Sequence, residues 1–338
     1  MLFINETENL EICFLEKENF QLTSDPILND ALRAAEAHKR IRYNIQKMIK
    51  PGCSLKEVIQ YVEDSTRIML KGEKNNGIGF PCGISINNVA AHFSLNPWNE
   101  DIFLKENDVL KIDFGTHSNG RIIDCAFTAC FDEKKKILLQ AAKEATEVGI
   151  KAAGIDAAVC EIGREINEVF KSYETENYKG DLVPIKPVWN LNGHSIAQYK
   201  IHAGISIPPI NNGDYSRIKE GFIALETFGS TGLGEIKENG ECSHFMLAKE
   251  NTNKIYNKKN QYVLDFIKKE FFTLPFSHRH IDFYIKDSKT SMQLLTARKF
   301  LEPYPPLIDV ENSFIAQFEH TIYLTEKGKT IVSRGEDF

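Results

Sequence analysis

The sequence predicts an α+β fold built from two related halves, and three observations support this. Helical spacing followed by strand-like segments occurs twice in the same order, over residues 25–131 and again over residues 136–228. The strand phrase ENDVLKIDFG, which starts at Glu106, is echoed by EGFIALETFG, which starts at Glu220. This spacing of about 110 residues is too long for a solenoid and indicates a degenerate duplication. A length of 338 residues suits one large domain that carries an insertion.

The helices of the first half have recognisable boundaries. The segment from Asp25-Pro26 to Ile49 has helical spacing and ends before Lys50-Pro51-Gly52, a stop signal. Ser54 with Glu57 forms a capping box, which predicts the start of a second helix. The predicted strand segments that follow are residues 77–93 (with a turn), 109–114 and 121–131.

The second half repeats this order before an insertion interrupts it. A helix is predicted over residues 136–153, and Asp156 is predicted to open the next helix. Strands are predicted over residues 189–199, 221–228 and 312–324. Residues 250–304 break the pattern and are interpreted as a small helical insertion, and residues 1–20 as an arm or edge strand.

Composition excludes several classes of function. A net charge of −6 opposes nucleic acid as the main ligand. The chain contains no run of eighteen apolar residues and no signal-peptide pattern at its start. Its seven cysteines are scattered and lack a CxxC pair, as is typical of reduced cytosolic thiols. We therefore expect a cytoplasmic protein with no membrane partner and no specific nucleic-acid partner. Composition leaves the oligomeric state open, and a monomer is the default expectation.

Acidic residues in apolar strand segments are the main candidates for a functional site. Carboxylates are rarely buried unless they are paired or bound to a cation. Four carboxylates and one imidazole suit a pair of divalent cations. The candidate ligands are Asp113, Asp124, His194, Glu226 and Glu319. Taken singly, His194 reads as a structural histidine, Glu226 as an ordinary strand-end acid and Glu319 as a partner of His320.

Hairpin geometry links the first two candidates. If residues 118 and 119 pair, Asp113 lies opposite Asp124; if the turn closes on Asn119-Gly120, Asp124 lies opposite Gly115. Both registers place the two carboxylates on one face of the hairpin. They would repel each other there, and a cation removes that penalty. The alternative is that one aspartate caps a turn or pairs with a basic group.

The sequence around these residues resembles the type 2 methionine aminopeptidases of peptidase family M24. The phrases that carry the resemblance are AAHFSLN, KIDFGTH, RIIDCAFT, LNGHSIAQYKIH, ALETFGSTG, CSHF, YPPL and AQFEHT. They run in order from about residue 25 to the C-terminus. The resemblance implies the pseudo-symmetric pita-bread fold, with a catalytic domain over residues 21–338 and the type 2 helical insertion over residues 250–304.

The resemblance also implies a dinuclear metal centre. Asp124 and Glu319 would bridge two divalent ions, Asp113 would chelate one, and His194 and Glu226 would bind the other. The metals Co, Mn, Fe and Zn all suit such ligands.

The activity that the resemblance implies is removal of the N-terminal methionine from nascent proteins and peptides, with a small second residue favoured. Two cations roughly 3.5–4 Å apart would activate a bridging hydroxide, which attacks the first peptide bond. Glu226 is our choice of general base. His202 would hydrogen-bond the carbonyl oxygen as charge develops, and His92 would contact the scissile amide. In the family, this first histidine is the one alkylated by fumagillin-type epoxides.

The methionine pocket is likewise implied by resemblance. Its expected lining residues are Phe80, Ile201, His244, Tyr304 and Leu307. Pro275 stands where some members carry alanine, so we expect a narrowed or reshaped pocket and an altered inhibitor preference.

Two other functions compete with this interpretation. A proline-specific aminopeptidase or dipeptidase would share the five ligands, but the insertion and the CSHF and YPPL phrases disfavour it. A non-enzymatic relative would have lost the ligands and would be more basic. Eukaryotic members often carry a long charged extension thought to aid ribosome association. Only about twenty residues precede the catalytic domain here, so ribosome association would need another surface.

Overall fold

The computed structural model describes residues 23–70, 75–249, 251 and 253–338, so the arm predicted over residues 1–20 lies outside the described residues. The helices are α1 (Pro26–Met48), α2 (Leu55–Met69), α3 (Lys136–Ala152), α4 (Val159–Lys171), α5 (Lys258–Glu270), α6 (His278–Tyr284) and α7 (Lys289–Ala297), with a 3₁₀ turn at Glu133–Lys135. The longer strands are β1 (Asn76–Ile86), β3 (Val109–Ser118), β4 (Arg121–Cys130), β10 (Gly221–Ser230) and β15 (Ile315–Thr325). The shorter strands are β2 (Val89–Ala91), β5 (Glu174–Glu176), β6 (Leu182–Pro184), β7 (Lys186–Pro187), β8 (Gly193–Ile196), β9 (Ser206–Ile207), β11 (Lys237–Glu238), β12 (His244–Leu247), β13 (Leu301–Tyr304), β14 (Leu307–Ile308) and β16 (Gly328–Ile331).

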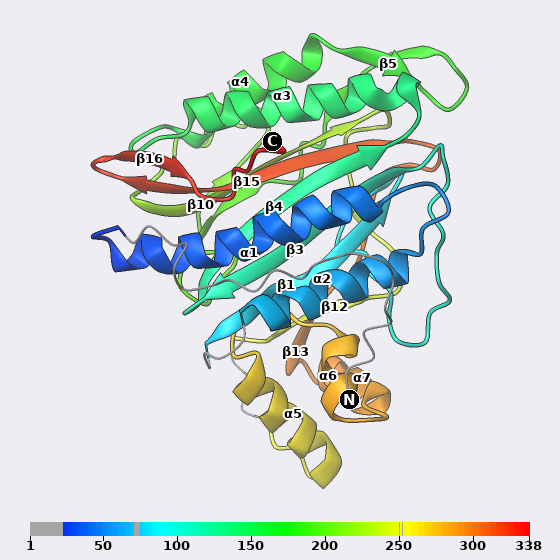
Figure 1. Cartoon of the computed structure of the whole chain (residues 1–338), viewed down its shortest axis with the longest axis vertical. Coiled ribbons are helices and arrows are strands. Elements are labelled where there is room, and N and C mark those ends of the chain that lie inside the picture. The colour runs from blue at the N-terminus through cyan, green and yellow to red at the C-terminus, as the bar shows by residue number, and fades with distance from the viewer. Residues whose placement is uncertain (1–22, 71–74, 250, 252) are drawn as a thin grey trace.

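Two sheets form the centre of the molecule, one from each half. The first has the strand order β1-β3-β4, and the second has the order β16-β15-β10-β8-β9, with β7 also paired to β10. Helices α1 and α2 lie against the first sheet, and α3 and α4 lie against the second (Figure 1). The α+β, pseudo-symmetric prediction is therefore confirmed.

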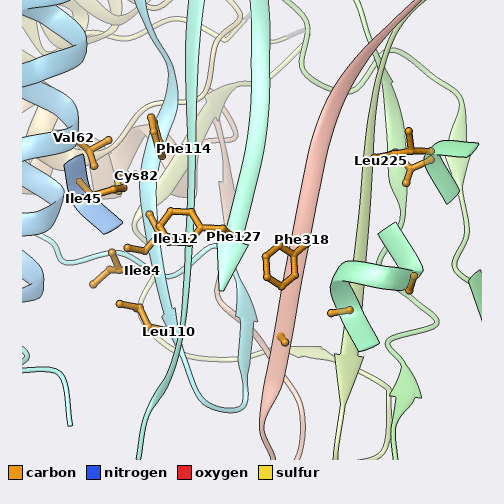
Figure 2. Packing of buried hydrophobic residues seen from close by; sticks show 14 of the residues in the cluster. Ile45, Val62, Cys82, Ile84, Leu110, Ile112, Phe114, Phe127, Leu225 and Phe318 are labelled. Atoms are coloured by element: carbon orange, nitrogen blue, oxygen red, sulfur yellow. The ribbon is translucent and has the colours of Figure 1, made fainter. Parts of the chain in front are cut away.

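Each central sheet is covered by helices on one face and carries the acidic residues on the other. On β3, Ile112 and Phe114 join the main hydrophobic core, whereas Asp113 between them points to the opposite face. Figure 2 shows this core extending from the first half to Leu225 on β10 and Phe318 on β15. One continuous core therefore supports both sheets from behind the acidic face.

The two sheets meet where threonine hydroxyls bridge β4 and β15. The hydroxyl of Thr321 accepts from the backbone N–H of Asp124 and donates to its carbonyl, both at 2.7 Å. The hydroxyl of Thr128 makes the equivalent pair of 2.7 Å bonds with the backbone of Gln317. These side chains satisfy strand edges that would otherwise be left unpaired. The bridges hold Asp124 close to β15.

The hairpin between β3 and β4 selects one of the two predicted registers. Ser118 pairs with Arg121, so the turn closes on Asn119-Gly120. Both turn residues have positive φ, 48° for Asn119 and 73° for Gly120, as a two-residue type I′ turn requires.

Some predicted boundaries are wrong. Helix α4 begins at Val159 rather than directly after Asp156, which has a positive φ of 65°. Among the residues that the structure describes, no side chain caps α4. Its first N–H groups are satisfied by a neighbouring loop, through Val159 N to the Ser216 carbonyl at 2.9 Å and Cys160 N to the Asp214 carbonyl at 3.1 Å. The strand predicted over residues 189–199 is shortened to Gly193–Ile196.

Helices α5, α6 and α7 lie together at one end of the molecule, beside β12 and β13 (Figure 1). They form a separate hydrophobic cluster that includes Val263, Ile267, Phe276 and Met292. Residues 301–304, at the end of the predicted helical segment, instead form β13 and pair with β12. None of the helices in the described residues combines the length and apolar character needed to span a membrane.

Candidate active site

Strand register places the five predicted ligands on one face. In the β10–β15 pair, Glu226 lies directly opposite Glu319. His194 on β8 lies opposite Ala224, two residues before Glu226, and so shares the face of Glu226. Asp124 lies opposite Gly115, two residues from Asp113, so this pair also shares a face. The two carboxylate pairs come from different halves of the chain.

Short distances connect these side chains. One ligand atom from each of Asp124, His194 and Glu319 lies within 4.8 Å of the others. The Nε2 atom of His194 is 3.5 Å from Oδ2 of Asp124. The buried amide of Gln317 connects the other two ligands, Glu226 and Asp113. Its Nε2 atom lies 3.1 Å from Glu226 Oε2 and 3.4 Å from Asp113 Oδ2.

The electrostatics of this cluster favour a bound cation. Burial raises the pKa of Asp113 to about 6, although the Gln317 amide opposes the shift. Burial, and then the charge of the neighbouring carboxylates, raise the pKa of Asp124, Glu226 and Glu319 well above the usual range. The four carboxylates therefore resist being ionised together. Positive charge placed among them would remove this penalty.

The donor set fits metal ions. Within the described part of the chain, Oδ1 of Asp113 and both side-chain oxygens of Glu319 are buried without a hydrogen-bond partner. Burial, and then nearby His202, lower the pKa of His194 to about 3, so its imidazole is neutral and has a lone pair to offer. Unpartnered buried oxygens beside a neutral imidazole are the ligands that a first-row divalent cation requires.

A cavity of about 200 Å³ opens beside these ligands. Six of the seven residues predicted to bind substrate line it: Phe80, His92, Ile201, His202, His244 and Tyr304. The seventh, Leu307, pairs with Ala91 on β2, which lines the cavity, and packs with it in one hydrophobic cluster. Pro275 lines the cavity, as predicted. The lining residues that sequence reasoning did not identify are Pro81, Gly83, Ser85, Ala91, Leu191, Asn192 and Met246.

The histidines are arranged around the cavity. The rings of His194 and His202 meet edge to face, with centroids 4.4 Å apart. The ring of His92 is edge-on to Tyr304 at 5.8 Å and tilted against His244 at 6.0 Å. Burial, and then His202, lower the pKa of His92 to about 4, so it is neutral near pH 7.

Two site-shaping residues escaped the sequence reasoning for different reasons. Gln317 is two residues before Glu319 and therefore on the same face of β15; this i, i+2 spacing was a usable signal. Gly115 leaves room for the ring of Phe80, since a Cβ at residue 115 would lie 2.2 Å from Phe80 Cδ1. No sequence pattern reveals that contact, because it joins β1 to β3.

Comparisons with known proteins agree with this geometry. The model of metallopeptidase family M24 matches residues 30–326. Methionine aminopeptidase 2 of Encephalitozoon intestinalis is 55% identical over 326 residues, which cover 95% of this chain and 91% of that protein. Methionine aminopeptidase 2 of Dictyostelium discoideum is 43% identical, over 92% of this chain and 72% of that protein.

Solved structures with lower identity share the fold. A thermophilic Arx1 superposes with a TM-score of 0.75 at 17% identity, covering 92% of this chain and 91% of that one. Methionine aminopeptidase from Thermotoga maritima gives a TM-score of 0.60 at 19% identity, covering 93% and 98%. Prolidase from Pyrococcus furiosus gives 0.54 at 16% identity, covering 93% and 66%. Given the family match and the high identity over almost the whole chain, this protein belongs to metallopeptidase family M24, among its methionine aminopeptidase 2 members.

Proposed function

We propose that this protein removes the N-terminal methionine from proteins and peptides by metal-dependent hydrolysis of the first peptide bond, favouring a small second residue. The observation that carries the proposal is the convergence of four carboxylates and one imidazole at the wall of a cavity of about 200 Å³. The high identity to methionine aminopeptidase 2 proteins supports the same activity.

The five converging side chains would hold two divalent metal ions. These ligands are Asp113, Asp124, His194, Glu226 and Glu319. Carboxylates and imidazole accept Co, Mn, Fe and Zn alike, so availability would decide between them. When bound, such ions supply Lewis acidity and a water of lowered pKa.

Glu226 is the proposed proton acceptor. Burial, and then Asp124 and Asp113, raise the pKa of its carboxyl well above the usual range. Bound cations would oppose this shift, so the carboxylate would be ionised and able to accept a proton. The Gln317 amide donates to Glu226 Oε2 and so orients the group. The proton that Glu226 accepts would pass to the leaving amine.

His202 and His92 are the proposed hydrogen-bonding groups for the reacting peptide bond. His202 stands against the ring of His194, where it can donate to the carbonyl oxygen as negative charge develops. His92 lines the same cavity and can hydrogen-bond the scissile amide nitrogen. The substrate's methionine side chain would occupy the apolar wall formed by Phe80, Ile201 and Tyr304, with His244 and Pro275 completing it. Leu307 would support that wall indirectly, through Ala91.

A peptide assay tests the activity. Metal-stripped protein is incubated with Met-Ala-Ser and, separately, with Ala-Pro-Ser, before and after addition of Mn²⁺ or Co²⁺. Metal-dependent release of methionine only, abolished by Glu226→Ala, is the expected result. Cleavage of Ala-Pro-Ser alone would assign the chain to the proline-specific alternative. No cleavage by folded, metal-loaded protein would favour the non-enzymatic alternative.

We also propose a cytoplasmic monomer that acts on nascent chains, with ribosome association through a surface of the catalytic domain. Size-exclusion chromatography with light scattering tests the monomer, and cosedimentation with ribosomes tests the association. A fumagillin-type epoxide should label His92, detected by peptide mass spectrometry, and His92→Gln should remain unlabelled.

A further inference from the structure

Glu63 on α2 is a buried carboxylate that lies outside the metal centre. Its side chain is only 6% exposed. Its Oε1 atom lies 2.6 Å from Nη2 of Arg279 and 3.0 Å from Nε2 of His280. The same oxygen accepts the backbone N–H of Cys82 at 3.4 Å. A single carboxylate oxygen therefore links α2, which carries Glu63, to both β1 and α6.

The contact with β1 occurs at an irregularity in its pairing. Phe80 lies opposite Gly115 and Gly83 lies opposite Asp113, so three steps on β1 match two steps on β3. The extra residue makes a β-bulge, which leaves backbone groups without ladder partners. Phe80 and Gly83 both line the substrate cavity, so this bulge shapes the cavity wall.

Glu63 satisfies the donor that the bulge releases. Proline at residue 81 has no N–H, so Cys82 provides the free donor, and it points to Glu63. The carbonyl of Cys82 accepts from the hydroxyl of Ser94 at 2.7 Å, two residues beyond His92 in the chain. The bulge is therefore held on both sides, by α2 and by the segment that carries His92.

Arg279 extends these contacts to the segment that follows His92. Its Nη1 atom donates to the carbonyl of Leu95, while its Nη2 atom contacts Glu63. One guanidinium thus joins the helical insertion to the His92 segment, and its fork geometry fixes both contacts at once.

The start of α6 is also connected to the cavity through the preceding residues. Phe276 exchanges backbone hydrogen bonds of 2.9 and 2.8 Å with Phe245, which lies between the cavity residues His244 and Met246. Pro275, the residue before this pairing, lines the cavity itself. Any shift at the start of α6 would therefore move two parts of the cavity wall.

We propose that Glu63 is a positioning residue for the methionine pocket: by holding Arg279, His280 and the Cys82 bulge together, it couples the insertion to the pocket wall and sets the selectivity for the first residue. This inference rests on the proposed aminopeptidase activity. Glu63 touches neither the reacting bond nor a proposed ligand, so it would act only through the wall. Loss of its charge would leave Arg279 without its buried counter-charge and would weaken the contact to the His280 ring.

The test compares Glu63→Gln with a matched buried ion pair elsewhere. Asp337→Asn disrupts the Arg42–Asp337 pair at 2.5 Å, in which Arg42 is fully buried and neither residue lines the cavity. Each variant is assayed with Met-Ala-Ser and Leu-Ala-Ser at a temperature where both are folded. Glu63→Gln should raise the KM for the methionine peptide and lower the Met/Leu ratio of kcat/KM about tenfold, as expected for a loosened apolar pocket. Asp337→Asn should leave that ratio unchanged.

A second readout does not depend on turnover. Hydrogen exchange followed by mass spectrometry should show faster exchange over residues 79–96 in Glu63→Gln and not in Asp337→Asn. A Met/Leu ratio within twofold of wild type, or unchanged exchange over residues 79–96, would overturn the inference. If Glu63→Gln does not fold, Arg279→Lys carries the same test, because lysine lacks the fork that reaches both Glu63 and Leu95. A wild-type protein that cleaves neither peptide would refute the proposed activity instead, and the exchange comparison would still test the inference.

Discussion

Replacing Gly115 with alanine should push the ring of Phe80 into the methionine pocket. The new Cβ would lie 2.2 Å from Cδ1 and 2.4 Å from Cε1 of that ring, whereas ordinary contact begins at 3.4 Å. The ring must therefore retreat by about 1.2 Å, the difference between 3.4 and 2.2 Å. Strand β3 blocks one side and the cavity of about 200 Å³ lies on the other, so the ring moves into the space proposed for substrate.

The structure sets the size of the expected loss of stability and of the expected rise in KM. Overpacking a well-packed site costs about 1–3 kcal/mol of unfolding free energy. With an unfolding entropy of about 2 cal/mol/K per residue, a chain of 338 residues loses roughly 1.5 °C of Tm per kcal/mol. The expected fall in Tm is therefore about 1.5–4.5 °C. The KM for Met-Ala-Ser should rise several-fold while kcat changes little, because the reacting groups themselves are not displaced.

Calorimetry and steady-state kinetics measure these two effects. Gly154→Ala is the matched control, because a Cβ at residue 154 meets no atom of the described residues within 4 Å and its φ is not positive. That variant should keep the wild-type Tm and KM. A Gly115→Ala enzyme with wild-type KM and Tm would refute the reasoning, because it would mean that Phe80 relaxes without entering the pocket.

Three further predictions concern the buried polar groups. Chelation of metal should lower the Tm, and Mn²⁺ or Co²⁺ should restore about 2.7 kcal/mol of stability at a hundredfold excess over Kd; Glu319→Gln should lose most of this gain. Gln317→Leu removes the amide bonded to two site carboxylates. It should lower kcat/KM roughly 10- to 100-fold, since hydrogen bonds to charged groups contribute about 1.5–3 kcal/mol. Burial alone would raise the pKa of Glu63, but Arg279 and His280 hold it well below 4.5, so its stabilising contribution is present above pH 4.5 and lost as the pH falls toward the folded pKa.

Each of these has a control and a contrary outcome. Metal should not stabilise Glu319→Gln as strongly as wild type, and equal shifts would remove Glu319 from the metal centre. For Gln317→Leu, Gln317→Glu is the comparison, because it restores the shape but adds a fifth carboxylate; unchanged kcat/KM in the leucine variant would show that the amide is dispensable. For the pH prediction, urea unfolding of Glu63→Gln should show a flatter loss of stability between about pH 5 and pH 3, and identical slopes would contradict it.

Local patterns predicted much of the fold and part of the site. The alternation within β3 and β4 and the turn at Asn119-Gly120 were sufficient to place Asp113 and Asp124 on one face. The echo between the two strand phrases predicted two related halves, and the fold confirms them; in that alignment Asp113 matches Thr227, the residue after Glu226. These signals succeed because each depends on the period of a single strand or on one short turn.

Other features depend on contacts between distant segments, which no local pattern encodes. The direct opposition of Glu226 and Glu319 follows from the register of β10 and β15, which are separated by the whole insertion. The start of α4 was mispredicted because a loop near Ser216, and no side-chain cap, satisfies its first turn. Leu307 was assigned to the pocket by resemblance, and the structure pairs it with Ala91 on β2, a residue that lines the cavity. The functional roles of the individual site residues stay predictions until the variants are measured.

The division of the carboxylates between the two halves has a consequence for how the protein matures. Asp113 and Asp124 are synthesised early, whereas Glu226 and Glu319 follow only with β10 and β15. A growing chain that lacks these later strands holds only half of the acidic ligands. It can therefore neither complete the proposed metal centre nor cleave other nascent chains. Metal uptake during refolding would therefore report the docking of the two halves across the threonine bridges.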